Sequence, residues 1–387
     1  MRIVRWILIA AATLVVLAGA ALITLTLLIN PDRYRGNIER VVSHATGRPF
    51  AIEGHLSLTW FPWLGVRMGR ARLGAAPGQP GPDLIDWRSA RMSVRLLPLL
   101  LHRQVVIGPI RLRGAVIHLW RGPRGRGNWQ DLLAHAPSGS SSSPAPPVLG
   151  GLTLTDGALY FQAQGKTVSV THWRLHVSAW EPGTPLTVST RFVLQGGPLP
   201  PAGLPVALRL RQLRLTLAPL TVSAPAASLE LADTTIQGSA TVRRGADGLA
   251  GEGTAALSVP SVRGLIGRLG LKMRLPKNPA ALGALTLDGH WRLTDDALAV
   301  NPLTGRLDAT RLSGWLDRSG GAQPLWTFAL EADQIDFARY LPPTRKHPKP
   351  FAVPVRALRA LHARGTLTVA RATFGRTTLQ NLRLQVQ

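Results

Sequence analysis

The stretch Val206–Leu217, VALRLRQLRLTL, places leucine on alternate positions, slips by one residue at Arg211-Gln212, and then resumes the alternation. Apolar residues at period 2 predict a β-strand with one apolar face. The slip predicts a β-bulge that bends the strand. The candidates for the lining of an apolar groove on this strand are Leu208, Leu210, Leu213, Leu215 and Leu217.

The same alternation recurs along most of the chain. Further candidates for the groove lining are Leu56, Leu58, Trp60, Trp63, Ile110, Leu112, Leu152 and Leu154. In GLTLTDGALYF, residues 151–161, the Asp156-Gly157 dipeptide predicts a hairpin turn. Similar strand–turn–strand units fall at residues 285–300, 305–316 and 365–386. We therefore expect at least a dozen short antiparallel strands, each with one apolar face.

The N-terminus carries an uncharged apolar run from Trp6 to Ile29. About 24 residues in a helix reach about 36 Å, enough to cross a hydrocarbon core of about 30 Å. A cleavable signal peptide is the alternative, with a cleavage-like site at Ala18-Gly19-Ala20, but the apolar run continues past it. The predicted membrane-anchor residues are Trp6, Ile7, Leu8, Leu14, Val15, Leu22, Leu25, Leu28 and Ile29. Arginines on both sides of the span leave its orientation open.

Three other segments depart from the strand pattern. A short amphipathic helix is predicted after Asn30-Pro31, with Ile38 and Val42 on its apolar face and Gly47 as its stop. Residues 134–150 form a Ser/Pro-rich linker. A short helix is predicted from Pro260 to about Leu269.

The charge balance is strongly basic, with 45 Lys+Arg against 20 Asp+Glu among 387 residues. This suggests an anionic partner, although arginines spread along strands also serve as solvated faces. Cysteine is absent, which excludes disulfides and thiolate metal sites.

Motifs of catalysis are absent from the sequence: it has no HExxH, P-loop or GxSxG pattern. His172 and His176 share a strand face too far apart to hold one metal. Asp295-Asp296 reads as a turn, and RGPRGRGNW, residues 121–129, reads as a loop between a strand and a helix. We assign no catalytic residue, no metal ligand and no cofactor, and we expect no nucleic-acid partner.

Several motifs together resemble the AsmA family of bacterial envelope proteins. They are Asn30-Pro31, Thr46-Gly47-Arg48-Pro49, Phe61-Pro62-Trp63-Leu64-Gly65, VRLLPLL at 94–100 and Gly127-Asn128-Trp129. Residues 262–317 and EADQIDFARYLPP at 331–343 are similar to a later part of the same family. The resemblance covers nearly the whole chain and is weakest between Pro182 and Glu252.

The resemblance implies a mainly β protein whose twisted antiparallel sheet curls into a groove behind an inner-membrane anchor, with its bulk in the periplasm. It implies a role in outer-membrane biogenesis, with phospholipid acyl chains held or conducted along the groove. The inner membrane, phospholipid and other envelope proteins are the partners we expect. A non-transporting assembly factor for outer-membrane proteins and a polyanion-binding protein are the alternatives.

The predicted domains are the anchor at 1–29, a helix with strands at 30–133, the linker at 134–150 and groove repeats at 151–387. A dozen strands make a groove of only about 58 Å. Because the sequence stops within an alternating run at Val386-Gln387, we expect either a truncated family member or a partner that extends the groove.

Trp60 and Trp63 flank Pro62, which ends a strand, and we expect them at the membrane-side mouth of the groove.

Overall fold

The computed structural model describes residues 35–59, 63–76, 78, 81–95, 106–122, 125–134, 148–197, 199–217, 220–245, 248–271, 273–320, 324–341 and 362–386. None of the helices in these ranges combines the length and the apolar character needed to cross a bilayer. The predicted anchor residues, from Trp6 to Ile29, lie outside the described residues.

The chain divides into two units, one up to Glu181 and one from Pro182 onward, and both are mainly β. The predicted domain boundaries at residues 29, 133 and 150 stay predictions. The helices and strands of the first unit are α2 (Arg35–Thr46), β1 (Phe50–Ile52), β2 (Leu56–Thr59), β3 (Trp63–Met68), β4 (Ala71–Leu73), β5 (Ile85–Trp87), β6 (Ser89–Arg95), β7 (Val106–Ile107), β8 (Ile110–Arg113), β9 (Val116–Arg121), α4 (Gln130–Ala134), β10 (Val148–Leu149), β11 (Leu152–Ala163) and β12 (Lys166–Val177).

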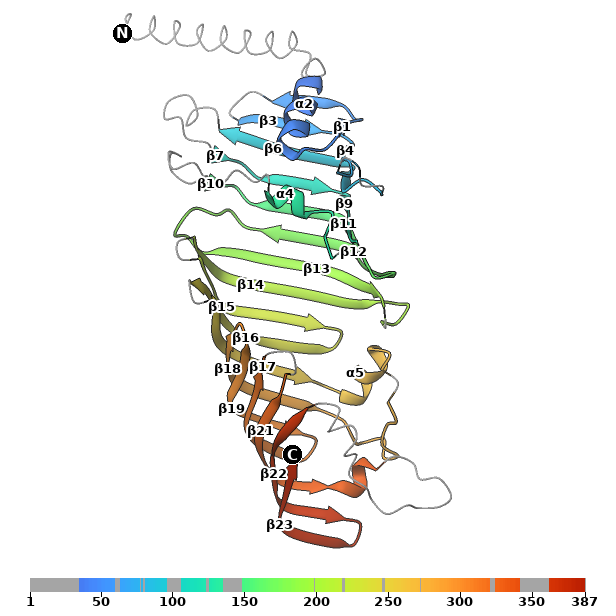
Figure 1. Cartoon of the computed structure of the whole chain (residues 1–387), viewed down its shortest axis with the longest axis vertical. Helices are drawn as coiled ribbons and strands as arrows, with labels where there is room; N and C mark the ends of the chain where they lie inside the picture. The colour runs from blue at the N-terminus through green and yellow to red at the C-terminus, as the bar shows by residue number, and fades with distance from the viewer. Residues whose placement is uncertain are drawn as a thin grey trace, which may run out of the picture. The chain divides into compact units, whose positions relative to one another are not determined.

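The second unit is built almost entirely of long strands (Figure 1). Its elements are β13 (Leu186–Gly196), β14 (Leu204–Leu217), β15 (Leu220–Leu231), β16 (Thr234–Gly245), β17 (Gly248–Val259), α5 (Val262–Arg268), β18 (Leu285–Thr294), β19 (Ala297–Leu307), β20 (Thr310–Ser319), β21 (Trp326–Asp336), η2 (Phe337–Tyr340), β22 (Ala363–Phe374) and β23 (Thr377–Val386).

In the first unit, most strands come as two short pieces on either side of a bend. The pieces β1 and β2, β3 and β4, β5 and β6, and β8 and β9 follow one another directly in the chain. One set pairs in the order β1–β4–β5–β9 and the other in the order β2–β3–β6–β8. Strand β11 pairs with both β8 and β9 and so joins the two sets into one bent sheet.

The predicted amphipathic helix is α2, and Gly47 ends it with a φ of 65°. Its apolar side chains Ile38 and Val42 pack on a core that contains Phe50 and Ile52 of β1. Its polar side chains also hold β1, because Ser43 Oγ accepts a hydrogen bond from the Phe50 N–H and Glu39 Oε1 accepts one from the Ile52 N–H. The helix therefore covers an edge strand whose backbone donors would otherwise lack partners.

The second unit is a meander in which each strand from β13 to β21 pairs antiparallel with the next. The three hairpins predicted at residues 285–300, 305–316 and 365–386 are confirmed, as is the short helix α5. The predicted bulge in β14 is also confirmed, because Gln212 has a φ of 55° and the register with β13 shifts beside it.

Two expectations are wrong in detail. The sheet is mixed, not wholly antiparallel, because β11 runs parallel to β8 and β9, and β22 runs parallel to β21. Residues 122–151 separate β9 from β11 in the sequence and residues 337–362 separate β21 from β22, which is the length of chain that a parallel pairing requires.

Asp156-Gly157 is not a hairpin turn. Strand β11 continues through it, and Asp156, with a φ of 57°, is the extra residue of a bulge between Leu154 and Gly157. An Asp-Gly pair supplies the same left-handed backbone to a bulge as to a tight turn.

Candidate functional site

One face of the second unit carries a continuous row of apolar residues. Cross-strand partners lie on the same face of a sheet, so the register identifies the members of this row. The row, one residue from each strand from β14 to β23, consists of Leu208, Leu229, Ile236, Leu257, Leu287, Gly305, Leu312, Ala332, Val369 and Leu382. We call it the apolar row; nine steps of about 4.8 Å give it a length of about 43 Å.

The opposite face is polar, as period-2 alternation requires. In β17 and β18, Leu257 and Leu287 are half-buried, whereas the adjacent Ala256 and Asp288 are exposed. The same holds in β14, where Leu208 and Leu210 share the apolar face and Arg211 is exposed.

A second row beside the apolar row is built of small residues in the middle of the sheet. Ala227, Gly238, Ala255 and Gly289 are successive cross-strand partners. A Cβ at Gly238 would lie 2.0 Å from the carbonyl oxygen of Thr254, so only glycine fits there. The register shifts in β15–β16 and β18–β19 fall beside this row, and we infer that the sheet bends along it.

The apolar row is covered at one end and open along the rest. Ala332 and Val369, on β21 and β22, are buried in a cluster that includes Phe337 of η2. Phe337 stacks on Phe374 with 4.6 Å between ring centroids. From Leu208 to Leu312, by contrast, the members of the row are only half-buried, and the main contacts of the described strands β14 to β20 are with their neighbours in the sheet.

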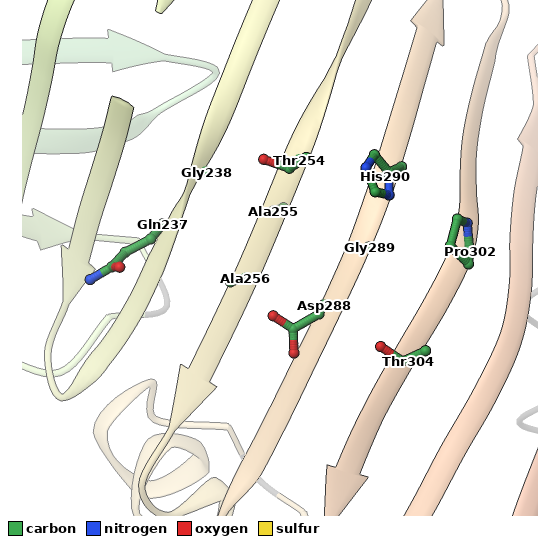
Figure 2. A pocket seen from close by; sticks show the side chains of 10 residues that line it. All are labelled: Gln237, Gly238, Thr254, Ala255, Ala256, Asp288, Gly289, His290, Pro302 and Thr304. Carbon is green, nitrogen blue, oxygen red and sulfur yellow. The ribbon is translucent and has the colours of Figure 1, made fainter. Parts of the chain in front are cut away.

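The polar face is hollowed beside the small-residue row (Figure 2). The hollow holds about 440 Å³, and Thr254, Asp288, His290 and Thr304 contribute side chains to its lining. These side chains stand on four neighbouring positions of three strands, β17, β18 and β19, and face the solvent. Within the described ranges no cluster of His, Asp and Glu could hold a metal ion.

The candidate lining residues of the first unit also gather on one face. The register links Leu56, Met68, Ala90, Leu112 and Leu154 in one line across β2, β3, β6, β8 and β11. A parallel line contains the candidates Leu58, Ile110 and Leu152. Leu56 and Leu154 are almost fully buried, at 4% and 5% exposure, so this face is more tightly covered than the open part of the apolar row.

Of the β14 candidates, Leu213 pairs with Leu186 and Leu215 with Val222, and both are half-buried. Trp60 lies outside the described residues, and only the backbone is described for Trp63 and Leu217. The expectation that Trp60 and Trp63 lie at the membrane-side end of the groove therefore stays a prediction.

Sequence reasoning missed a buried arginine in the first unit. The side chain of Arg48 has no exposed surface and forms an ion pair with Asp131 of α4, with 2.6 Å between Nη2 and Oδ1. Its guanidinium also donates to the carbonyl oxygens of Gly74 and Asn128. The resemblance had singled out both Thr46–Pro49 and Gly127–Trp129, and the structure brings these motifs together.

Asn128 and Asp131 complete this network. The buried Asn128 side chain accepts from the Trp120 N–H and donates to the carbonyl oxygen of His118, which ties the predicted loop at residues 121–129 to β9. Burial alone would raise the pKa of Asp131, but the hydrogen bonds and charge of Arg48 outweigh it and hold the pKa below its usual value.

A second polar centre lies at the edge of the other unit. Asp308, in the β19–β20 turn, accepts hydrogen bonds from the backbone N–H groups of Leu282 and Gly283 and from the hydroxyl of Tyr340, 2.8 Å away. Burial, followed by the hydrogen bond to Asp308, raises the pKa of Tyr340 to about 12. Both polar centres have a structural role: Arg48 and Asp131 connect the end of α2 to α4, and Asp308 connects the β19–β20 turn to Tyr340 and to the backbone before β18.

The remaining polar residues singled out in the sequence are strand and turn positions. His172 is a bulge residue with a φ of 53°, and the His176 ring nitrogen lies 3.3 Å from the hydroxyl of Thr153. Asp295 stands in the β18–β19 turn, where its carboxylate accepts from the Leu249 N–H.

Comparisons with known proteins agree with the resemblance for the N-terminal part of the chain. Residues 1–178 match the sequence model of the AsmA family. A curated protein, Protein AsmA of Escherichia coli strain K12, is 36% identical over 106 residues, which cover 27% of this chain and 17% of that protein. The chain thus aligns with less than a fifth of that relative's length, and no solved structure gives a significant match.

Proposed function

We propose that this protein is anchored in the bacterial inner membrane, extends into the periplasm and serves outer-membrane biogenesis, because residues 1–178 match the AsmA family model. The apolar run from Trp6 to Ile29 supports the anchor. The resemblance of the motifs at 30–65, 94–100 and 127–129 to those of the family supports the periplasmic orientation.

In this proposal the second unit holds phospholipid by its acyl chains, and the observation that carries it is the apolar row. A sheet face of half-buried leucines needs a second layer or a ligand. The described helices of this unit, α5 and η2, stand at the ends of strands and leave the row open from Leu208 to Leu312.

The energetics favour an acyl chain as the ligand. Burial of a methylene group is worth about 0.8 kcal/mol, so a 16-carbon chain gains up to about 12 kcal/mol in an apolar site. The open part of the row, from Leu208 to Leu312, is six steps of about 4.8 Å, or about 29 Å long, so an extended chain of that length fits within it and can shift along it by a few strands. Because Phe337 covers the row at Ala332 and Val369, the ligand lies between β14 and β20.

The proposal assigns no chemical reaction to the protein and needs no cofactor. Its partners are the inner membrane, phospholipid and other envelope proteins, and it gives nucleic acid no role.

An assembly factor that binds outer-membrane proteins by strand addition is the second candidate. Among the described strands, β23 pairs only with β22, and the other edge of β23 is where such an addition would take place. This alternative requires an intact edge of the sheet but no open apolar row, which makes the two proposals separable.

The test places charge on the apolar row in cells that depend on this protein. Leu257→Glu combined with Leu287→Glu should abolish support of the envelope barrier, measured as sensitivity to detergent. The matched control, Ala256→Glu with Thr286→Glu, changes adjacent exposed residues of the same two strands and should leave the barrier intact. If both doubly substituted proteins fold and support the envelope barrier equally well, the result would refute the lipid role and favour strand addition.

A further inference from the structure

We propose that the loop after α5 docks the second unit onto an anionic lipid surface. The docking loop consists of residues 269–271 and 273–277 together with Leu341, which is held beside it by a hydrogen bond from the Lys277 N–H to the Leu341 carbonyl oxygen. The inference does not depend on what the apolar row binds.

Large apolar side chains of this loop point into solvent. Leu271 is 48% exposed, Met273 61% and Leu341 38%, and they belong to the few large apolar residues of the described chain with so much exposed surface. In a folded protein, large apolar side chains exposed on one short loop mark a site of interaction.

The backbone presents these side chains in a fixed way. The Leu271 N–H donates to the Ile266 carbonyl and the Gly270 N–H to the Gly267 carbonyl, with Gly270 at a φ of 66°. This is a Schellman motif, which normally tucks the residue after the glycine against the last turn of the helix. Here Leu271 remains half exposed, and the next hydrogen bond, from the Met273 N–H to the Leu271 carbonyl, turns Met273 outward.

Arg263 of α5 fixes the far end of the loop. Its guanidinium donates to the carbonyl oxygens of Pro276 and Asn278, at 2.8 and 2.7 Å, and also to that of Ala281. Arg268 pairs with Asp233 in the β15–β16 turn, which ties the end of α5 to the sheet. The docking loop is therefore held in shape before any partner arrives, and ordering it on binding costs little.

The charge around the loop selects an anionic partner. Residues 262–287 contain five Lys and Arg and no Asp or Glu. Arg274 and Lys277 are exposed, and among the described residues neither has an ion-pair partner. Apolar side chains flanked by such cations fit the boundary between anionic head groups and acyl chains.

The chain itself does not supply the occupant. The segment closest in sequence to Leu341, residues 342–361, has five Lys and Arg and no Asp or Glu, so it would add positive charge to a positive site. An anionic lipid surface satisfies the apolar and the charged side chains together.

The absence of cysteine gives a clean test in the full chain. The protein carries Met273→Cys with an environment-sensitive dye and is held in a phosphatidylcholine nanodisc. Vesicles containing phosphatidylglycerol should shift the dye emission toward that of an apolar medium, whereas phosphatidylcholine vesicles should not. A dye on Thr286→Cys, on the exposed polar face of β18, should not respond to either.

Substitutions then separate the docking loop from general basicity. Arg274→Ala with Lys277→Ala should weaken the affinity for phosphatidylglycerol vesicles by about 30-fold, since each cation near such a surface contributes about a factor of five. The matched control, Arg292→Ala with Arg306→Ala, removes two exposed arginines of the polar face and should leave the affinity unchanged.

Three results would overturn the proposal. In the first, neither kind of vesicle shifts the emission of the dye at position 273, which is the result expected of a loop that binds a protein partner. In the second, both kinds of vesicle shift the emission equally. In the third, the two doubly substituted proteins lose affinity for phosphatidylglycerol vesicles to the same extent.

Discussion

Arg48 shows how a single residue connects elements that lie far apart in the sequence. Its guanidinium follows α2 and binds Asp131 of α4 and the backbone before that helix, 80 residues away in the chain. A buried arginine is tolerated only when carboxylate and carbonyl groups surround it, and here both are present. The pair therefore fixes where α4 sits on the sheet of the first unit.

Replacement of Arg48 by methionine should destabilise the region around α2 and α4. The loss should be about 3 kcal/mol, the low end of the range for a broken buried ion pair, because Asp131 keeps partial contact with water. Hydrogen exchange of residues 35–52 and 125–134, followed by mass spectrometry, measures the change. Arg70→Met removes a mostly exposed arginine and should alter exchange little; equal protection in both variants would contradict the role of Arg48.

Tyr340 reports on the polar centre at Asp308. Its pKa is raised to about 12 in the folded protein, so the stability it contributes is present below about pH 10 and is lost as the pH rises toward 12. A titration of tyrosinate absorbance should show a component for Tyr340 that ionises in this high range. Tyr340→Phe should remove that component and Tyr160→Phe should retain it; the reverse pattern would show that Tyr340 is not held by Asp308.

At the scale of elements, the sheet is shaped by residues that interrupt regular pairing. The bulge at Gln212 could be predicted because the alternate positions of leucine shift by one residue there, from 208 and 210 to 213 and 215, and this shift is visible in the sequence. The bulge at Asp156 could not, because alternation on both sides of an Asp-Gly pair is the same for a hairpin and for a bulged strand. The parallel pairing of β11 with β8 and β9 decides between them, and that contact is not local in sequence.

Glycine at position 238 should be essential to the pairing of β16 with β17. Gly238→Ala brings its Cβ against the Thr254 carbonyl oxygen and should cost about 1–3 kcal/mol, measured as faster hydrogen exchange of β16 and β17. Gly245→Ala, at the end of the same strand, adds a Cβ with nothing within 4 Å and should be tolerated. Undisturbed exchange in Gly238→Ala would mean that the strands can separate at no cost.

At the scale of the whole molecule, the strand-rich class and the one-sided apolar pattern follow directly from alternation. The extent of the open face does not. Phe337 closes the apolar row at β21 and β22 from a four-residue 3₁₀ helix, and no local pattern in FARY, residues 337–340, indicates which strands it covers. Likewise Arg48 offers no local sign of burial, since arginine is normally exposed.

The central claim is that the open part of the apolar row contacts lipid in the cell. The direct measurement is photo-crosslinking with a benzophenone amino acid at Leu257, on the row, and at the adjacent Ala256, on the polar face, followed by mass spectrometry of the purified full chain. We predict phospholipid adducts at position 257 and none at position 256. Equal adducts at both positions, or no lipid at position 257, would contradict the account.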